Sequence, residues 1–268
     1  MLNDPQKESE TEAIEVSCFF VRERNALLVR GEFSPIYTDF YLHLMQHQIR
    51  YEKDQDQLLK DSLAALTLHL ASRPWSEAVA WTLTTKSPLQ NLFVTGSNRQ
   101  GNVTGRVFTE NIKEPEKDLL YSQTMTDGES ARQSVIETKN TDFFASVEAY
   151  YQQSEQRDAR FFRHSEEDFV FITAQPDCDI PWLESLNDET IRDIDQQETL
   201  SLLETRQYRF DCGCSVGKLF PIVGGMSEAA IEEVFAGKEV IKASCPRCGA
   251  SYALTREALE AFQAENEE

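Results

Sequence analysis

Four of the six cysteines of the chain lie near its C-terminal end. Cys212 and Cys214 form a C-x-C pair around Gly213, and Cys245 and Cys248 form a C-x-x-C pair after thirty intervening residues. Thiolates in two such pairs are ligands that a tetrahedral zinc ion prefers. No histidine lies near them in the sequence. The spacing therefore predicts one Zn²⁺ per chain, bound by Cys212, Cys214, Cys245 and Cys248.

The same thiols could also take part in redox chemistry. Cysteines in a C-x-C pair can form a strained disulfide that is easily made and easily reduced. Zinc-bound thiolates react with peroxide and hypochlorous acid, and their oxidation ejects the metal. A purely structural zinc ribbon more often carries two C-x-x-C pairs. The residues alone leave both a structural and a redox-active zinc centre open.

The other cysteines and the histidines are weaker candidates. Cys18 lies in an apolar stretch and is expected to be a buried, inert thiol. Cys178 is expected to be exposed, and the aspartates on either side of it should disfavour its thiolate. His43 and His47 are four residues apart on a predicted helix, but no third ligand is adjacent. The motifs of nucleotide-binding and serine-hydrolase sites are absent from the sequence, so no catalytic residue is predicted.

A large α+β segment precedes the cysteines. Strands are expected within 16–33, 77–110, 131–138 and 158–175, and helices within 37–49, 55–71 and 141–156. This order predicts a body domain over 1–175, with helices on one side of a mixed sheet.

Two smaller segments follow the body. Residues 176–207 are predicted to be an acidic helical connector, since 176–204 hold nine acids, one base and a weak helical pattern. Residues 208–268 form a segment too short for a generous core, and a bound metal would explain how it folds. We therefore predict a zinc-binding, redox-switch domain over 208–268.

The overall composition argues against two classes of binding partner. The formal net charge is −20 and the isoelectric point is near 4.6. Such a surface repels phosphate backbones and anionic lipids, so neither nucleic acid nor a membrane is an expected partner. The first twelve residues are polar and lack an apolar signal region, which favours a cytoplasmic location. In that reducing compartment a metal site is a better explanation of the cysteines than structural disulfides.

Several stretches together resemble the heat-shock protein 33 family of redox-regulated holdase chaperones. They are "FDCGCS" (210–215), "CPRCGASYALTREAL" (245–259) and "FASVEAYYQQSEQRDARFF" (144–162), which includes Q-S-E-Q at 153–156. "VRGEF" (29–33) and "LLKDSLAALTLHLAS" (58–72) match more loosely. The resemblance covers most of the chain from about residue 18.

The resemblance implies an α+β substrate-binding domain, a helical linker and a Cys₄ zinc domain. It implies that the reduced, zinc-bound protein is inactive as a chaperone. Oxidation would form the disulfides Cys212–Cys214 and Cys245–Cys248, release zinc and unfold the small domain. Unfolding client proteins would then bind, and the oxidised form could be a homodimer.

These arguments favour an ATP-independent, non-enzymatic chaperone that is activated by oxidation. The alternative is an adaptor or constitutive chaperone-like protein in which the zinc is purely structural. A thiol oxidoreductase ranks third, because the thioredoxin-like βαβ pattern expected around its C-x-x-C motif is absent.

Overall fold

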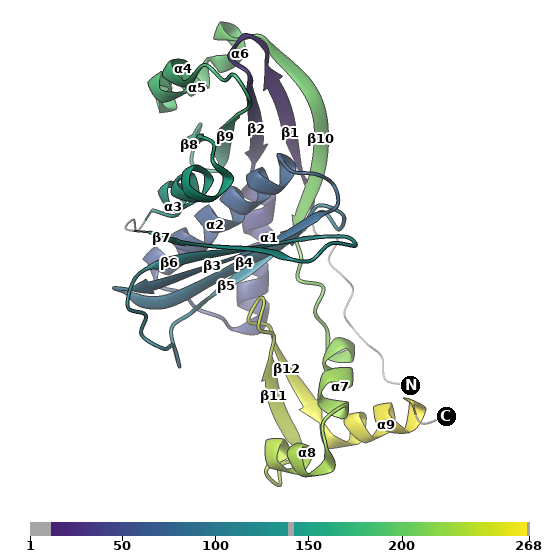
Figure 1. Ribbon diagram of the computed structural model, residues 1–268. Coiled ribbons are helices and arrows are strands. Elements are labelled where there is room, and N and C mark those ends of the chain that lie inside the picture. Colours follow the sequence, from purple (N-terminus) through teal and green to yellow (C-terminus); the bar gives the residue numbers. More distant parts are fainter. Residues whose placement is uncertain (1–11, 139–141, 267–268) are drawn as a thin grey trace.

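The computed structural model describes residues 12–138 and 142–266, and most of its strands form one ten-stranded sheet (Figure 1). The strand order is β7-β6-β3-β4-β5-β10-β1-β2-β9-β8. Neighbouring strands are antiparallel except β5 and β10, which are parallel. The strands are β1 (Ile14–Val21), β2 (Ala26–Glu32), β3 (Glu77–Lys86), β4 (Leu89–Ser97), β5 (Asn102–Phe108), β6 (Leu119–Thr126), β7 (Arg132–Glu137), β8 (Ala159–Arg163), β9 (Asp168–Ala174) and β10 (Leu200–Phe210).

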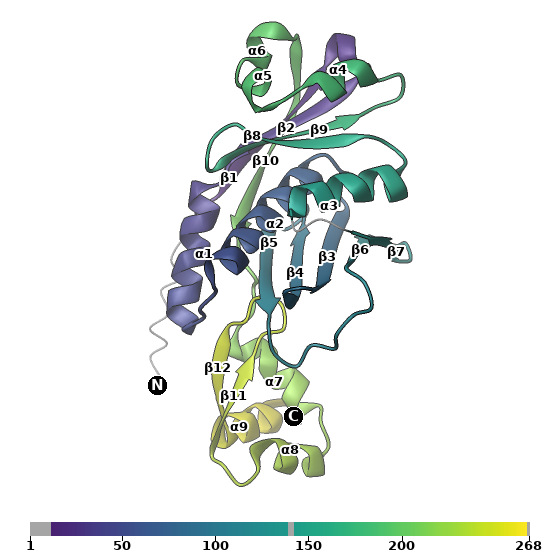
Figure 2. The ribbon, with the colours of Figure 1, turned by 90° about the vertical axis from the view of Figure 1, so that its left-hand side faces the viewer.

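Helix α2 (Lys53–Ala71) lies at the centre of this body. It contacts β3, β4 and β5 in one half of the sheet and β1, β2 and β9 in the other. Figure 2 shows it between the two halves, beside α3 (Phe143–Tyr150). The glycines of β4 and β5 permit this close approach, since a Cβ on Gly96 would lie 2.7 Å from Leu70 Cδ1. This arrangement confirms the predicted α+β fold class.

The remaining body helices are short or peripheral. Helix α1 (Ser34–His47) packs on β10, and a short helical turn, η1 (Arg22–Arg24), joins β1 to β2. A π-helical turn, η2 (Tyr151–Glu155), continues α3 and contains most of the Q-S-E-Q run.

The connector is helical only in its first part. Helices α4 (Ile180–Ser185), α5 (Asp188–Arg192) and α6 (Ile194–Gln197) bury apolar side chains against the strands around β9. From Leu200 the chain forms β10 instead, so the helical pattern expected there is wrong. The reason is an alternation that the acidic residues obscure, in which Arg206, Tyr208 and Phe210 are buried and the residues between them are exposed.

The C-terminal segment forms a separate small module below the body in Figures 1 and 2. It contains α7 (Val216–Gly224), α8 (Glu228–Phe235), a hairpin of β11 (Val240–Ser244) and β12 (Ser251–Thr255), and α9 (Arg256–Asn266). Its apolar core is small, with Ile231, Phe235 and Leu259 buried. Most of the module's order must therefore come from something other than apolar burial.

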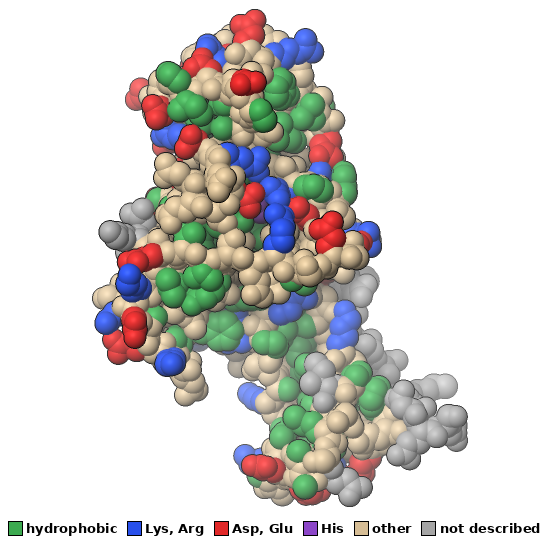
Figure 3. All heavy atoms as spheres, viewed as in Figure 1, with side chains coloured by type: hydrophobic (Ala, Val, Ile, Leu, Met, Phe, Trp, Pro, Cys, Tyr) green, Lys and Arg blue, Asp and Glu red, His purple; other side chains and the backbone are tan. Residues whose placement is uncertain are grey.

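The surface is strongly charged but not uniformly so. Figure 3 shows acidic, basic and apolar side chains mixed at the connector end, and apolar side chains on the half-sheet formed by β3 to β7. On that half-sheet Tyr121 and Val135 are cross-strand partners and are 42% and 53% exposed. Among the described residues, no helix is both long and apolar enough to cross a membrane.

Candidate metal centre

The four predicted cysteines meet where the small module joins the body. Cys212 and Cys214 follow β10 directly, and Cys245 and Cys248 lie in the turn between β11 and β12. Their sulfur atoms all lie within 4.8 Å of one another. The Cys212–Cys245 and Cys214–Cys248 sulfurs are 3.6 and 3.4 Å apart. Sulfurs around a tetrahedral zinc ion would be about 3.8 Å apart, so these four residues could bind one metal ion.

Two left-handed glycines shape the loops that carry the thiols. Gly213 has a φ of +62° between the first two cysteines, and Gly249 has a φ of +80° after the last. The Gly249 amide donates to the Cys245 carbonyl at 2.9 Å, which closes the C-x-x-C turn. An L side chain would be strained at either glycine. The sequence thus folds locally into two turns that present sulfur atoms to a common point.

Contacts among the clustered thiols shift the pKa values of Cys212, Cys214 and Cys248. Hydrogen bonds from Cys212 and Cys248 lower the pKa of Cys214 well below its usual range. The same contacts raise the pKa of Cys212 and of Cys248. The Tyr252 hydroxyl lies 3.2 Å from Cys214 Sγ and 3.0 Å from the Cys214 carbonyl oxygen. The arrangement favours a thiolate at Cys214, which is the form that binds metals.

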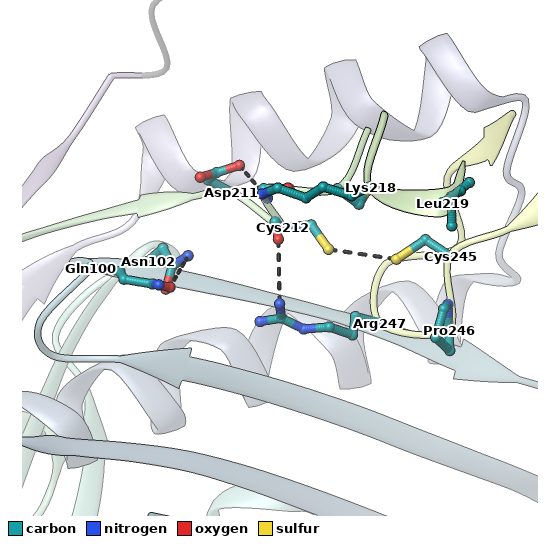
Figure 4. Close-up of a pocket in the computed structure, with 11 residues that line it drawn as sticks. Gln100, Asn102, Asp211, Cys212, Lys218, Leu219, Cys245, Pro246 and Arg247 are labelled. Atoms are coloured by element: carbon teal, nitrogen blue, oxygen red, sulfur yellow. Dashed lines mark hydrogen bonds between the residues drawn. The ribbon is translucent and has the colours of Figure 1, made fainter. Parts of the chain in front are cut away.

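The thiols differ in their access to solvent. Cys245 and Cys248 are 4% and 1% exposed, whereas Cys212 and Cys214 are half-buried. A cavity of about 430 Å³ opens beside Cys212 and Cys245, with Lys218 and Arg247 in its wall (Figure 4). Small solutes can therefore reach the centre from this side.

The other two cysteines lie far from this centre in the body. Cys18 is buried in β1, as predicted, and burial raises its pKa to about 11. Cys178 was expected to be exposed but is half-buried against the connector's apolar cluster. Burial is the main cause that raises its pKa, and the neighbouring Asp179 adds to it. Neither thiol belongs to the cluster of metal-binding side chains found in the described residues.

His43 and His47 lie next to the cysteines, which sequence reasoning missed. His43 Nε2 is 3.0 Å from the Cys248 carbonyl oxygen, and the His47 ring packs 5.6 Å from that of Tyr252. Burial lowers the pKa of His43, so its ring is neutral near pH 7. Their spacing placed both on one helix face, but nothing in the sequence indicated what that face contacts.

Comparisons with known proteins agree with this geometry. A family model described as "Hsp33 protein" matches residues 173–255. The "33 kDa chaperonin" of Edwardsiella ictaluri (strain 93-146) is 24% identical over 270 residues, which cover 89% of this chain and 92% of that protein. That of Aliivibrio salmonicida (strain LFI1238) is 24% identical over 262 residues, covering 84% and 88%.

The fold agrees as well. The crystal structure of the 33 kDa chaperonin, a heat shock protein 33 homolog, from Thermotoga maritima superposes with a TM-score of 0.72. The match covers 95% of this chain and 99% of that one at 11% identity, so it bears on the fold alone. Together, the match to the family model over the connector and the cysteine module, the relatives matched over most of their length and the shared fold make this chain similar to the Hsp33 family in sequence and in fold.

Proposed function

We propose that this chain is an ATP-independent holdase chaperone of the Hsp33 family that oxidation of a zinc-thiolate centre activates. The observation that carries the proposal is the cluster of four thiols at the junction between module and body, all within 4.8 Å of one another. Clients would be unfolding proteins in the cytoplasm, and the action would be binding without catalysis.

The donor set fits zinc. Four sulfur ligands and no oxygen or nitrogen ligand favour a soft or borderline metal, and zinc is the commonest ion in such sites. When bound, zinc would join the loop after β10 to the β11–β12 turn. Cys212, Cys214, Cys245 and Cys248 would hold it as thiolates.

Oxidation would remove these ligands. Each disulfide, Cys212–Cys214 and Cys245–Cys248, would form when two thiolates lose two electrons to one peroxide molecule, which takes up two protons from the solvent and leaves as two waters. Sulfur contacts of 3.6 and 3.4 Å run between the pairs, whereas each disulfide joins two sulfurs of one pair about 2.05 Å apart, so the turns must move for the bonds to form. A module with so few buried apolar side chains is expected to unfold when its metal leaves.

An apolar surface for clients is available on the body. Tyr121 and Val135 lie exposed on the outer face of β6 and β7, above a shallow cavity of about 350 Å³ that Phe93 also lines. Helices α4 to α6 pack near β9 rather than over this face. Larger exposed apolar patches mark interaction surfaces, and we propose these side chains as part of one, in a wall whose other residues are mostly polar. We also propose 1–175, 176–207 and 208–268 as body, connector and switch domain, and a homodimer as a state of the oxidised protein.

Two measurements test the proposal. Elemental analysis should find one zinc per reduced chain and none after all four cysteines are changed to serine. Light scattering of a heat-denaturing client should be suppressed by peroxide-oxidised protein and not by reduced protein. Equal suppression by both forms would indicate a constitutive chaperone.

One observation favours a second candidate, an adaptor with a permanent structural zinc. Strand β10 is anchored in the sheet as far as Phe210, so only Asp211 separates it from Cys212. Little chain is then available to loosen between the metal centre and the body. Zinc retained after peroxide treatment, without client protection in either state, would support the adaptor.

A further inference from the structure

Two body side chains hold the C-x-x-C turn by its main chain. Arg106 of β5 donates from Nη1 to the Cys245 carbonyl oxygen at 3.0 Å. His43 of α1 lies with Nε2 3.0 Å from the Cys248 carbonyl oxygen. Because a carbonyl oxygen only accepts, this His43 nitrogen carries the hydrogen. The first and last residues of the turn are thus both bound by the body.

The body fixes both donors before they meet the turn. The Arg106 guanidinium lies 4.1 Å from the centre of the Phe108 ring. The His43 ring packs 5.4 Å from that of Phe210 and 4.7 Å from that of His47. Side chains held in this way lose little freedom when they form a hydrogen bond.

The turn also fits the body sterically. A Cβ on Gly249 would lie 3.1 Å from Ile49 Cδ1 and 3.7 Å from the Arg106 guanidinium. The absent side chain and the φ of +80° therefore let the turn approach both residues closely. This contact is specific to the folded shape of the turn, in which the carbonyl oxygens point to the body and the sulfurs to the metal centre.

We propose that Arg106 and His43 are positioning residues of the metal centre, which clamp the C-x-x-C turn in its metal-binding shape and slow metal release. This inference rests on the metal-binding part of the proposed function. The clamp binds only the ordered turn, so by linkage it stabilises the metal-bound state over any state in which the turn rearranges. Partners of this outer kind are worth about tenfold to hundredfold in metal affinity. The body would thereby set how readily the metal centre releases its ion.

The test measures zinc release from the reduced, full-length protein into excess 4-(2-pyridylazo)resorcinol at constant pH. Arg106→Met keeps the packing on Phe108 but removes the donor, and His43→Phe keeps the ring but removes its nitrogen. Each should release zinc about tenfold faster than the wild type. Arg106→Lys and His43→Gln restore a donor and should return the rate towards the wild-type value.

Arg99→Met is the matched control. Arg99 is an exposed arginine at the tip of the same half-sheet that pairs with Asp127 and should not affect release. Release rates within twofold of wild type in both Arg106→Met and His43→Phe would overturn the clamp. A wild-type protein that binds no zinc would overturn the proposed function as well, so the two failures are distinguishable. Urea unfolding of each variant checks that the body is intact, and if one variant does not fold the other carries the test.

Discussion

Arg206 anchors β10 to the body just before the cysteines. It is 4% exposed, and its Nη1 donates to the Leu70 and Arg73 carbonyl oxygens at 3.1 and 2.7 Å. The Leu70 carbonyl lies in the last turn of α2 and also accepts from the Arg73 amide at 2.9 Å, and Arg73 follows the end of the helix. The guanidinium also lies 4.4 Å from the Trp75 ring centre and pairs with Glu204.

The contacts predict the effect of Arg206→Ala. Each hydrogen bond from a charged donor contributes about 1.5–3 kcal/mol. Asn98 Nδ2 still donates to the same two carbonyl oxygens, at 2.9 and 3.4 Å, so neither is left without a donor. Arg206→Ala should therefore lower the free energy of unfolding by about 3 kcal/mol, which is the lower end of the range for two such bonds.

Urea unfolding followed by far-UV circular dichroism measures this loss. With a slope of about 2–3 kcal/mol per molar urea, the midpoint should fall by about 1 M or slightly more. Arg209→Ala, an exposed arginine on the same strand, is the control and should change stability by less than about 0.5 kcal/mol. A loss below about 1 kcal/mol for Arg206→Ala, or one equal to that of the control, would refute the role assigned to the side chain.

Three further predictions concern the module and the body core. Chelating the metal from reduced protein should speed hydrogen exchange across 216–266 and leave the amides around Tyr208 and Phe210 protected. Mass spectrometry measures the exchange of both regions. A joint loss of protection in both would contradict this prediction. Phe235→Ala should destabilise the module by about 3–5 kcal/mol, because Phe235 is fully buried in its small core, and should leave the urea midpoint of the body unchanged. His69 is buried and its folded-state pKa is well below 6.5, so stability should be highest above pH 6.5 and fall by up to about 1.4 kcal/mol per pH unit below it. His69→Asn should flatten that slope between pH 6.5 and 5.5 in urea titrations, and an unchanged slope would count against the argument.

The cysteine cluster was predictable because short spacings fix it. A C-x-C and a C-x-x-C each bring two sulfurs together locally, and only one long-range contact remains to be guessed. The start of α9 depends on neighbours just as close in sequence, since Thr255 Oγ1 accepts from the Ala258 amide at 3.2 Å.

Strand β10 was not predictable in this way. Its leucines and flanking acids also fit a weak helix, and the partner that decides between the two is β1, almost the whole body away in sequence. The contacts of His43 and Arg106 with the C-x-x-C turn are harder still. These contacts depend on how the body and the C-terminal module dock, and the local sequence pattern carries no information about that docking.

The pairing of β1 with β10 also governs how the chain acquires its fold during synthesis. Ser17 and Thr205, which face each other across these strands, are 188 residues apart. At about 5–20 residues per second, a ribosome needs roughly 10–40 s to make the chain between them. Until β10 is made, the edge of β1 and, once it has been made, that of β5 have no partner, and open strand edges are templates for aggregation. The nascent protein thus passes through a stage with open strand edges before β10 closes the ten-stranded sheet, and Cys212, Cys214, Cys245 and Cys248 leave the ribosome only afterwards.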